Sequence, residues 1–116
     1  MRFTNSDERL DAVFSALAHP IRRALLARLQ RGTATVGELA APFDVSLMAV
    51  SKHLAVLERA ALVQREPEGR YTRCTIQRDS LDEAAEWIES HTRFWTSQLA
   101  SLGEYLDHPP PSESAR

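Results

Sequence analysis

The apolar residues of this chain change their spacing from that of helices to that of strands and back again. From residue 10 to about residue 60 they recur every three or four positions, which is the period of amphipathic helices. Two runs rich in β-branched and aromatic residues follow, Leu62–Glu66 and Tyr71–Ile76, joined by Pro67–Arg70. This pattern predicts a β-hairpin with proline and glycine in its loop. A second helical pattern, from Ser80 to about Leu106, comes after it.

Two helices are predicted before residue 31. Pro20 separates them, because the residue before a proline avoids the helical region and proline itself suits the first turn of a helix. The second helix then runs from Pro20 to about Gln30, and Gly32 is expected to be its C-terminal cap. Apolar residues at helical spacing mark the first helix: Leu10, Val13, Phe14 and Leu17.

A short helix, a turn and a longer helix come next, which is the order of a helix-turn-helix unit. Thr35 and Glu38 have the spacing of a capping box at the start of the short helix, and Pro42 cannot extend that helix. Ser46 is expected to cap the longer helix, which continues to about Ala60. The apolar positions expected on the inner face of this helix are Leu47, Val50, Leu54 and Leu57.

The composition is that of one small domain. The chain has 116 residues, of which 43% are hydrophobic, and this is enough for one modest core. We expect an N-terminal arm over residues 1–7, a mainly α domain with a small β-hairpin (α+β) over residues 8–106, and a disordered tail over residues 107–116. No segment has the pattern of a membrane span or a secretory signal, and a single cysteine fits a reducing compartment, so we expect a cytoplasmic protein.

The net charge of −2 conceals an uneven distribution of charge. Residues 19–78 hold ten basic and five acidic side chains, a net charge of +5, and the remainder of the chain carries −7. A basic segment of this kind either faces a polyanion or is simply an uneven protein surface. It coincides with the predicted helix-turn-helix and hairpin, which favours a nucleic-acid partner.

The longer helix of the pair is predicted to read DNA with the face that the core leaves free. Small residues near its start let the backbone enter a major groove, while Ser and Lys can donate to bases or phosphates. The hairpin is predicted to act as a wing whose arginines contact phosphates or a narrow minor groove, the alternative being ordinary surface arginines. For His53 the alternative is local packing. The candidate DNA-binding residues are Ser46, Met48, Ala49, Ser51, Lys52, His53, Arg65, Arg70 and Arg73.

The last helix is longer than a core of this size can cover, because about 26 residues span roughly 39 Å. Ser80 and Glu83 are expected to form a capping box at its start. Its wide apolar surface indicates pairing with a second copy of the chain, unless its aromatic residues close the core of the monomer. A symmetric dimer would place two reading helices about one DNA turn apart. The candidate dimer-interface residues are Leu10, Phe14, Ile88, Trp95, Leu99 and Leu102.

Three blocks of the sequence resemble the ArsR/SmtB family of bacterial repressors: Leu10–Leu26, Val45–Glu58 and Leu62–Arg70. The resemblance covers roughly residues 8–106. It implies a homodimeric winged helix-turn-helix protein that represses transcription and releases double-stranded DNA when a signal changes the dimer. The family's reading helix corresponds to Ser46–Ala60 and its wing to Arg65–Arg73. The expected DNA partner is a partly palindromic operator.

The metal ligands typical of that family are missing at the corresponding positions. One family site uses two cysteines on the helix before the reading helix, where this chain has Val36–Ala40. Another site, on the last helix, has the pattern D-x-H-x10-H-x2-E/H. Here Asp82 is followed by Glu83 and Ala84, so the first histidine is missing, and the position that lies ten intervening residues after His91 is Leu102. We therefore expect no metal and no other cofactor, and the sequence does not identify the effector.

Two residues are candidates for a switch that needs no metal. Cys74 could be oxidised, but no second cysteine can resolve it, and a role as a small buried apolar residue fits better. His91 could be protonated at a dimer contact, or it could be a hydrogen-bonded interface histidine, which we favour.

The sequence has no motif typical of an enzyme. It contains no glycine-rich phosphate loop, no HExxH and no G-x-S-x-G, so we expect a non-enzymatic protein. The competing hypothesis is a winged-helix module that binds proteins or dimerises without binding DNA. The basic middle segment and the small residues on the reading helix favour a DNA-binding transcriptional regulator.

Overall fold

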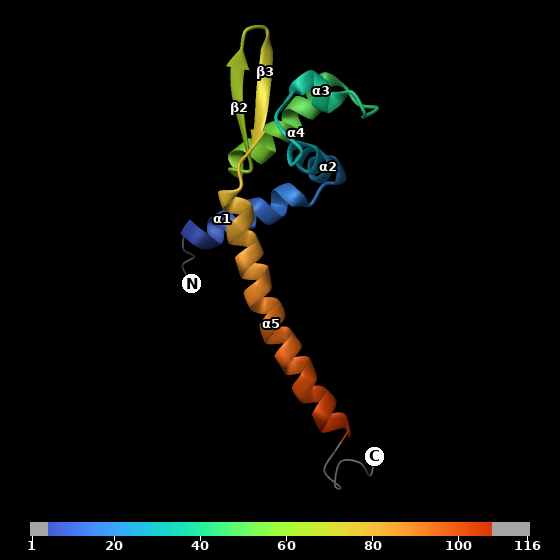
Figure 1. Ribbon diagram of the computed structural model, residues 1–116, viewed down its shortest axis with the longest axis vertical. Coiled ribbons are helices and arrows are strands. Elements are labelled where there is room, and N and C mark those ends of the chain that lie inside the picture. The colour runs from blue at the N-terminus through green and yellow to red at the C-terminus, as the bar shows by residue number, and fades with distance from the viewer. Residues whose placement is uncertain (1–4, 108–116) are drawn as a thin grey trace. The chain divides into compact units, whose positions relative to one another are not determined.

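The computed structural model describes residues 5–107, which form five helices and a three-stranded sheet (Figure 1). The elements in chain order are α1 (Asn5–Leu17), α2 (Pro20–Leu29), β1 (Ala34–Thr35), α3 (Val36–Ala40), α4 (Leu47–Arg59), β2 (Val63–Glu68), β3 (Tyr71–Ile76) and α5 (Asp79–Asp107). The predicted fold class, mainly α with a small hairpin, is confirmed. Helix α1 already begins at Asn5, within the segment expected as an arm, and all but the first residue of the expected tail lies outside the described residues.

The chain divides into two compact units, Met1–Ala84 and Ala85–Arg116. The first contains every element from α1 to the start of α5, and the second contains the rest of α5. None of the helices in the described part has both the length and the apolar character needed to cross a membrane.

The sheet is antiparallel, with the strand order β1-β3-β2. Strand β2 continues through Pro67, because β2 lies at the edge of the sheet, where a residue without an N–H group is tolerated. Glu68 pairs with Tyr71, so the turn consists of Gly69 and Arg70 alone, and the expected loop from Pro67 to Arg70 was too long. Gly69 has a φ of +63°, which favours glycine in a two-residue hairpin turn.

Strand β1 was not predicted, because two residues are too few to produce an alternating pattern. It pairs Ala34 with Cys74 and Thr35 with Arg73, and it thereby joins α3 to the hairpin. The prediction of Gly32 as the cap of α2 was wrong by two positions, because Gln30 is the C-cap. Gly32 instead carries the chain out of the helix at a φ of +139°.

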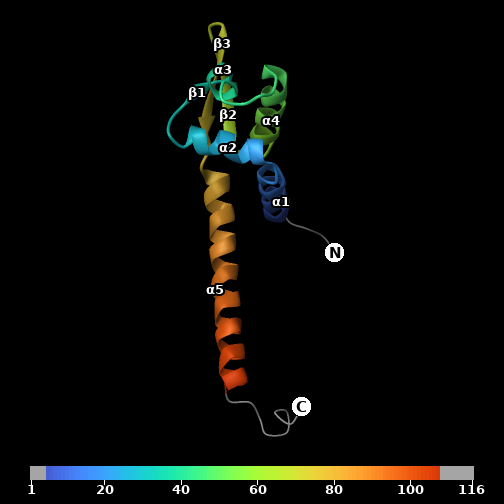
Figure 2. The same ribbon diagram turned by 90° about the vertical axis from the view of Figure 1, so that its right-hand side faces the viewer.

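The core of the first unit lies where α4 packs against α2, α3 and strand β2 (Figure 1 and Figure 2). Val50, Leu54 and Leu57 of α4 are completely buried, as their spacing predicted. Leu47 was expected on the same face but is 57% exposed. It has the right angle around the helix, yet it is the first residue of α4, where the helix extends past the core. The other completely buried leucines are Leu25, Leu29, Leu39 and Leu62.

Two of the predicted helix caps are confirmed. The Thr35 hydroxyl oxygen accepts from the N–H of Glu38 at 3.1 Å, and the Glu38 carboxylate accepts from the N–H of Thr35 at 2.9 Å. These bonds to Thr35 lower the pKa of Glu38. The Ser46 hydroxyl oxygen accepts from the N–H of Ala49 at 3.0 Å and so begins α4. Each cap depends on residues three positions apart, which is why the sequence reveals it.

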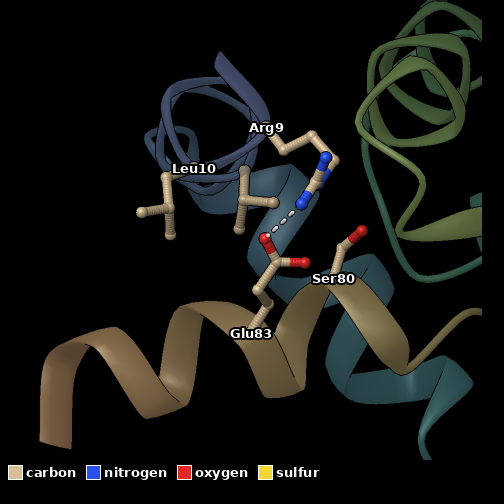
Figure 3. Close-up of a pocket in the computed structure, with 5 residues that line it drawn as sticks. Arg9, Leu10, Ser80 and Glu83 are labelled. Carbon is tan, nitrogen blue, oxygen red and sulfur yellow. Dashed lines mark hydrogen bonds and ion pairs between the residues drawn. The ribbon is translucent and has the colours of Figure 1, made fainter. Parts of the chain in front are cut away.

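The capping box predicted at the start of α5 was wrong. The helix begins at Asp79, so Ser80 lies inside its first turn, where it is buried. The Glu83 carboxylate does not turn back to Ser80 but accepts from the Arg9 guanidinium of α1 at 3.0 Å (Figure 3). It also accepts from the Ser6 hydroxyl at 3.4 Å. The sequence could not reveal this, because the competing partners lie more than 70 residues away.

Candidate nucleic-acid interface

The N-terminal half of α4 presents polar and apolar side chains at the surface. Lys52 and Met48 are exposed, and Ala49 is half-buried. Within residues 5–107, the Lys52 ammonium forms no hydrogen bond or ion pair. Ser46 is exposed, although its hydroxyl oxygen caps the helix. The first two turns of α4 therefore offer one free cation and several small or apolar side chains to a ligand.

Arg70 occupies the turn between β2 and β3, and the tip of this hairpin extends past α3 and α4 (Figure 1). Its side chain is exposed, and it too forms no hydrogen bond or ion pair in the described part of the chain. Arg73 lies further along β3 and is bound to Glu68, with Nε 2.6 Å from one carboxylate oxygen and Nη2 2.7 Å from the other. Arg70 is thus the wing arginine that is free to contact a phosphate.

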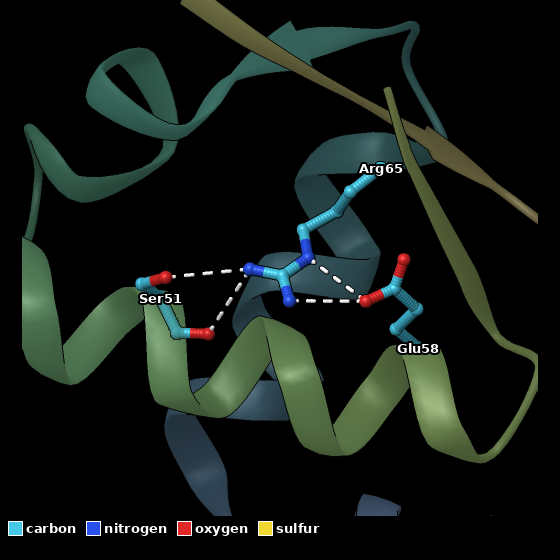
Figure 4. Close-up of polar contacts among 3 residues, drawn as sticks. All are labelled: Ser51, Glu58 and Arg65. Atoms are coloured by element: carbon cyan, nitrogen blue, oxygen red, sulfur yellow. Dashed lines mark hydrogen bonds and ion pairs between the residues drawn. The ribbon is translucent and has the colours of Figure 1, made fainter. Parts of the chain in front are cut away.

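Arg65 of β2 is held against α4 by three groups of that helix (Figure 4). Its Nε and Nη2 donate to one carboxylate oxygen of Glu58 at 3.1 and 3.0 Å. Its Nη1 donates to the hydroxyl and the carbonyl oxygen of Ser51 at 3.3 and 3.5 Å. Its side chain is only 23% exposed. Direct binding of Arg65 to DNA stays a prediction, and it would compete with these bonds.

His53 lies on the side of α4 that faces the start of α2. Its ring centroid is 4.3 Å from that of His19, and its Nδ1 accepts from the Arg22 guanidinium at 3.3 Å. Burial of the ring lowers the pKa of His53, and the neighbouring His19 and Arg22 lower it further. Of the two interpretations that the sequence left open for His53, these contacts correspond to local packing. A DNA contact by the same ring stays a prediction.

Some of the basic residues of the middle segment serve the fold. Arg22 donates to the carbonyl oxygens of Ala16 and Ser15 at 2.6 and 3.2 Å, and Arg23 donates to that of Leu17 at 2.7 Å. Both guanidinium groups therefore cap the C-terminal end of α1, where a positive charge also opposes the helix dipole. A count of charges along the sequence cannot distinguish such caps from cations available to a ligand.

A hollow of about 720 Å³ lies between the start of α4, the start of α3 and the wing. It brings Leu47 and Met48 of α4 into one surface with Arg70 and Tyr71 of the hairpin. Leu47 and Tyr71 are exposed, and neither was predicted to belong to this surface. The position of Leu47 at the first turn of the helix was the signal that could have identified it. The residues that line the hollow are Thr35, Val36, Gly37, Leu47, Met48, Ser51, Arg70, Tyr71 and Thr72.

The residues predicted for the dimer interface fall into both units. Leu10 and Phe14 of α1 are half-buried and pack against the core of the first unit. Ile88, Leu99 and Leu102 of α5 are exposed, at 47%, 64% and 51% respectively. Trp95 belongs to the same predicted set, but its side chain lies outside the described part of the structure.

The two candidate switch residues have very different surroundings. Cys74 is completely buried in β3, and burial raises the pKa of its thiol, so the reactive thiolate is disfavoured. His91 is exposed on α5, stacks on the ring of Trp87 at 4.0 Å, and its Nδ1–H donates to the Trp87 carbonyl oxygen at 2.8 Å. Among the residues that the structure describes, no three His, Cys, Asp or Glu side chains form a group suited to a metal ion.

Comparison with known proteins identifies similar sequences and structures over most of the chain. A family profile described as a helix-turn-helix domain matches residues 17–66. The HTH-type transcriptional regulator Rv2034 of Mycobacterium tuberculosis is 42% identical over 97 residues, which cover 84% of this chain and 88% of that protein. The transcriptional repressor SdpR of Bacillus subtilis is 28% identical, with 68% of this chain and 88% of that protein covered.

The similar solved structures are transcriptional regulators as well. The crystal structure of an ArsR family transcriptional regulator, RHA00566, matches with a TM-score of 0.74 and 38% identity, covering 84% of this chain and 98% of that one. An ArsR-like transcriptional regulator from Rhodococcus sp. RHA1 matches with a TM-score of 0.72 and 29% identity, covering 87% of this chain and 95% of that one. The likeness therefore includes the helix-turn-helix, the wing and much of α5.

Proposed function

The chain belongs to the ArsR family of winged helix-turn-helix transcriptional regulators, and from this premise we propose that it binds a partly palindromic DNA operator as a homodimer and represses transcription. Family membership confirms the prediction that the chain is not an enzyme. A regulator of this kind acts on bacterial chromosomal DNA, and its place of action is then the cytoplasm. An unidentified signal releases the protein from DNA.

One observation carries the proposal that DNA is the ligand. Two cations, Lys52 on α4 and Arg70 at the tip of the wing, are exposed and form no bond to any other described residue. Arg70 lines the hollow between α4 and the wing, and Lys52 is next in sequence to Ser51, which also lines it. Both cations therefore lie near the small residues in the first turns of α4. A helix that enters the major groove beside a wing arginine on the backbone uses this arrangement.

The candidate residues divide into two groups, according to whether their side chains are already bonded to other parts of the protein. We assign Ser46, Met48 and Ala49 to the major groove, and Lys52 and Arg70 to the phosphates beside it. Ser51, His53, Arg65 and Arg73 are already bonded within the protein, so they contact DNA only at its rim or act by holding α4 and the wing in place.

Dimer formation is supported by the exposed apolar positions of α5. Ile88, Leu99 and Leu102 fall on one stripe of the helix, and each is about half exposed or more. Monomeric soluble proteins rarely leave several large apolar side chains exposed along one face of a helix. Two copies that pair through this stripe would give the protein the twofold symmetry of a palindromic operator.

The test is binding of the purified protein to duplexes that tile the region upstream of its own gene, measured by fluorescence anisotropy from 50 to 300 mM salt. We expect one duplex to bind specifically, with an affinity that falls steeply as salt rises, because lysine and arginine contacts release counterions from the phosphates. Lys52→Ala and Arg70→Ala should each weaken binding without changing the dimer. Absence of any specific duplex at 50 mM salt would favour the protein-interaction module instead.

A further inference from the structure

The reading surface contains a pair of large apolar side chains that the fold does not use. Leu47 is 57% exposed and Met48 is 68% exposed, at the first turn of α4. Tyr71 of the wing is 65% exposed and lines the same hollow. Single exposed apolar residues are normal, but here three of them share one concave surface. A ligand that covers this surface must offer apolar groups to it.

The polar groups near this pair are few, and two of them already serve the fold as acceptors. The Ser46 hydroxyl oxygen accepts from the N–H of Ala49, and the half-buried Ser51 hydroxyl accepts from Arg65. The donors left on this part of the helix are the hydroxyl hydrogens of Ser46 and Ser51 and the Lys52 ammonium. The forked side chains that make two hydrogen bonds to one base in a fixed geometry are those of Arg, Asn and Gln, and positions 46–52 contain none of them.

The major groove of DNA presents one apolar group, the C5-methyl of thymine, beside hydrogen-bond donors and acceptors. A helix that enters the groove with Leu and Met at its tip matches that methyl group and no feature of a G·C pair. The cations Lys52 and Arg70 beside the apolar pair match the phosphates on either side of the groove. This combination of charge and apolar surface fits a DNA duplex better than an apolar protein segment.

We propose that Leu47 and Met48 are specificity-determining residues, which select thymine at fixed positions of each operator half-site by packing against its C5-methyl group. This inference rests on the proposed DNA-binding function and adds to it the chemical group that is read. Arg70 and Lys52 supply affinity that does not depend on sequence, and the apolar pair supplies discrimination.

The experiment removes the methyl group and leaves base pairing intact. A preferred duplex is first selected by the wild-type protein from a random library, and it is then synthesised with deoxyuridine in place of every thymidine. Loss of one buried methyl group should weaken binding about fourfold, and loss of one in each half-site of a dimer roughly 15-fold. Dissociation constants for the two duplexes are measured by anisotropy at one salt concentration.

Two variants identify the residues that sense the methyl group. In the double variant Leu47→Ala, Met48→Ala, the ratio of affinities for the thymidine and deoxyuridine duplexes should fall close to one. Both side chains are exposed, so the variant should keep the thermal stability of the wild type. Arg70→Ala is the matched control, because it should weaken binding to both duplexes equally and keep the wild-type ratio.

The outcomes separate this inference from the function on which it rests. If the wild type binds both duplexes equally, or if the double variant keeps the wild-type ratio, the assignment of Leu47 and Met48 is overturned while DNA binding stands. If no duplex is enriched from the library, the proposed function itself fails. A wild-type preference for thymidine that the double variant loses, and Arg70→Ala keeps, supports the inference.

Discussion

Ala61 follows the reading helix in a backbone conformation that suits glycine better than alanine. Its φ is +59°, and it is the one residue other than glycine with a positive φ in the described chain. The N–H of Ala61 donates to the Glu58 carbonyl oxygen at 3.0 Å, and the N–H of Leu62 donates to that of Leu57 at 2.9 Å. These two bonds form a Schellman motif, and the buried Leu57 and Leu62 supply its apolar contact.

We expect Ala61→Gly to stabilise the protein. The left-handed conformation costs a residue with a Cβ about 1–2 kcal/mol, and the greater freedom of glycine in the unfolded chain returns about 0.5–1 kcal/mol. The free energy of unfolding in urea should therefore rise by roughly 0.5–1 kcal/mol. Ala60→Gly is the control, since Ala60 has a φ of −86°, and this change should only destabilise. A loss of stability in Ala61→Gly would contradict the strain assigned to this position.

His53 makes the stability of the first unit depend on pH. Burial lowers its pKa in the folded protein below the ordinary value of 6.5. Around and below pH 6.5 the unfolded chain therefore binds more protons at this residue than the folded protein does, so the free energy of unfolding falls as the pH falls. The groups that face the ring are His19 and the Arg22 guanidinium, which add to the cost of a second positive charge.

His53→Gln should reduce the dependence of stability on pH. We expect the difference between the free energies of unfolding at pH 7.5 and pH 5.5 to be smaller in the variant than in the wild type, because the group that takes up the proton is removed. The measurement is urea denaturation at both pH values, followed by circular dichroism. Equal differences in the two proteins would mean that His53 does not titrate across this range.

At the scale of elements, Arg65 is the contact that joins the wing to the reading helix. An exposed ion pair contributes little, but a guanidinium that binds a carboxylate twice and also a hydroxyl is held in one geometry. Strand β2 and helix α4 thereby present Arg70 and Lys52 at a fixed separation. Arg65 is a positioning residue in this interpretation, and Arg70 is the residue that contacts a phosphate.

The salt dependence of DNA binding distinguishes these two roles. Arg70→Met should lower the slope of log K against log salt by about 1 for each protomer, since one phosphate contact is lost. Arg65→Met should weaken binding at every salt concentration but leave the slope unchanged. Glu58→Gln, which weakens the same contact from the other side, should resemble Arg65→Met. A reduced slope in Arg65→Met would assign Arg65 to the backbone of DNA after all.

Local signals explain which elements the sequence could predict. The caps at Thr35 and Ser46 depend on neighbours three residues away, and the interruption before Pro20 is a property of proline itself, so all three were readable. The partners of Arg65 and Glu83 lie 7 to 77 residues away and are chosen by the fold. For this reason the expected capping box at Ser80 and the expected freedom of Arg65 could not be judged from the sequence.

The candidate site shows the same limit. Spacing along α4 identified Lys52 and Met48 as outward-facing, and turn chemistry located Arg70 in the hairpin. Leu47 was assigned to the core because angle alone does not tell how far the core extends along a helix. Tyr71 lies on this surface because strand pairing in the hairpin places the start of β3 near the start of α4. That placement is not visible in the sequence.

At the scale of the whole molecule, two reading surfaces are needed for a palindromic operator, and α5 is the element available to join two copies. Leu99 is 64% exposed in the middle of the apolar stripe of α5. Leu99→Glu should convert a dimer into a monomer, because pairing would bury two unpaired carboxylates close together. The measurement is molar mass by light scattering across a range of protein concentrations.

Ser97→Glu is the matched control, since position 97 is exposed on the opposite side of the same helix and adds the same charge. It should remain dimeric. The monomeric variant should lose most of its affinity for a full operator but bind an isolated half-site as the wild type does, because Lys52 and Arg70 belong to the other unit of the chain. Two other results would each exclude this face of α5 as the interface: a dimer in Leu99→Glu, or a monomer in both variants.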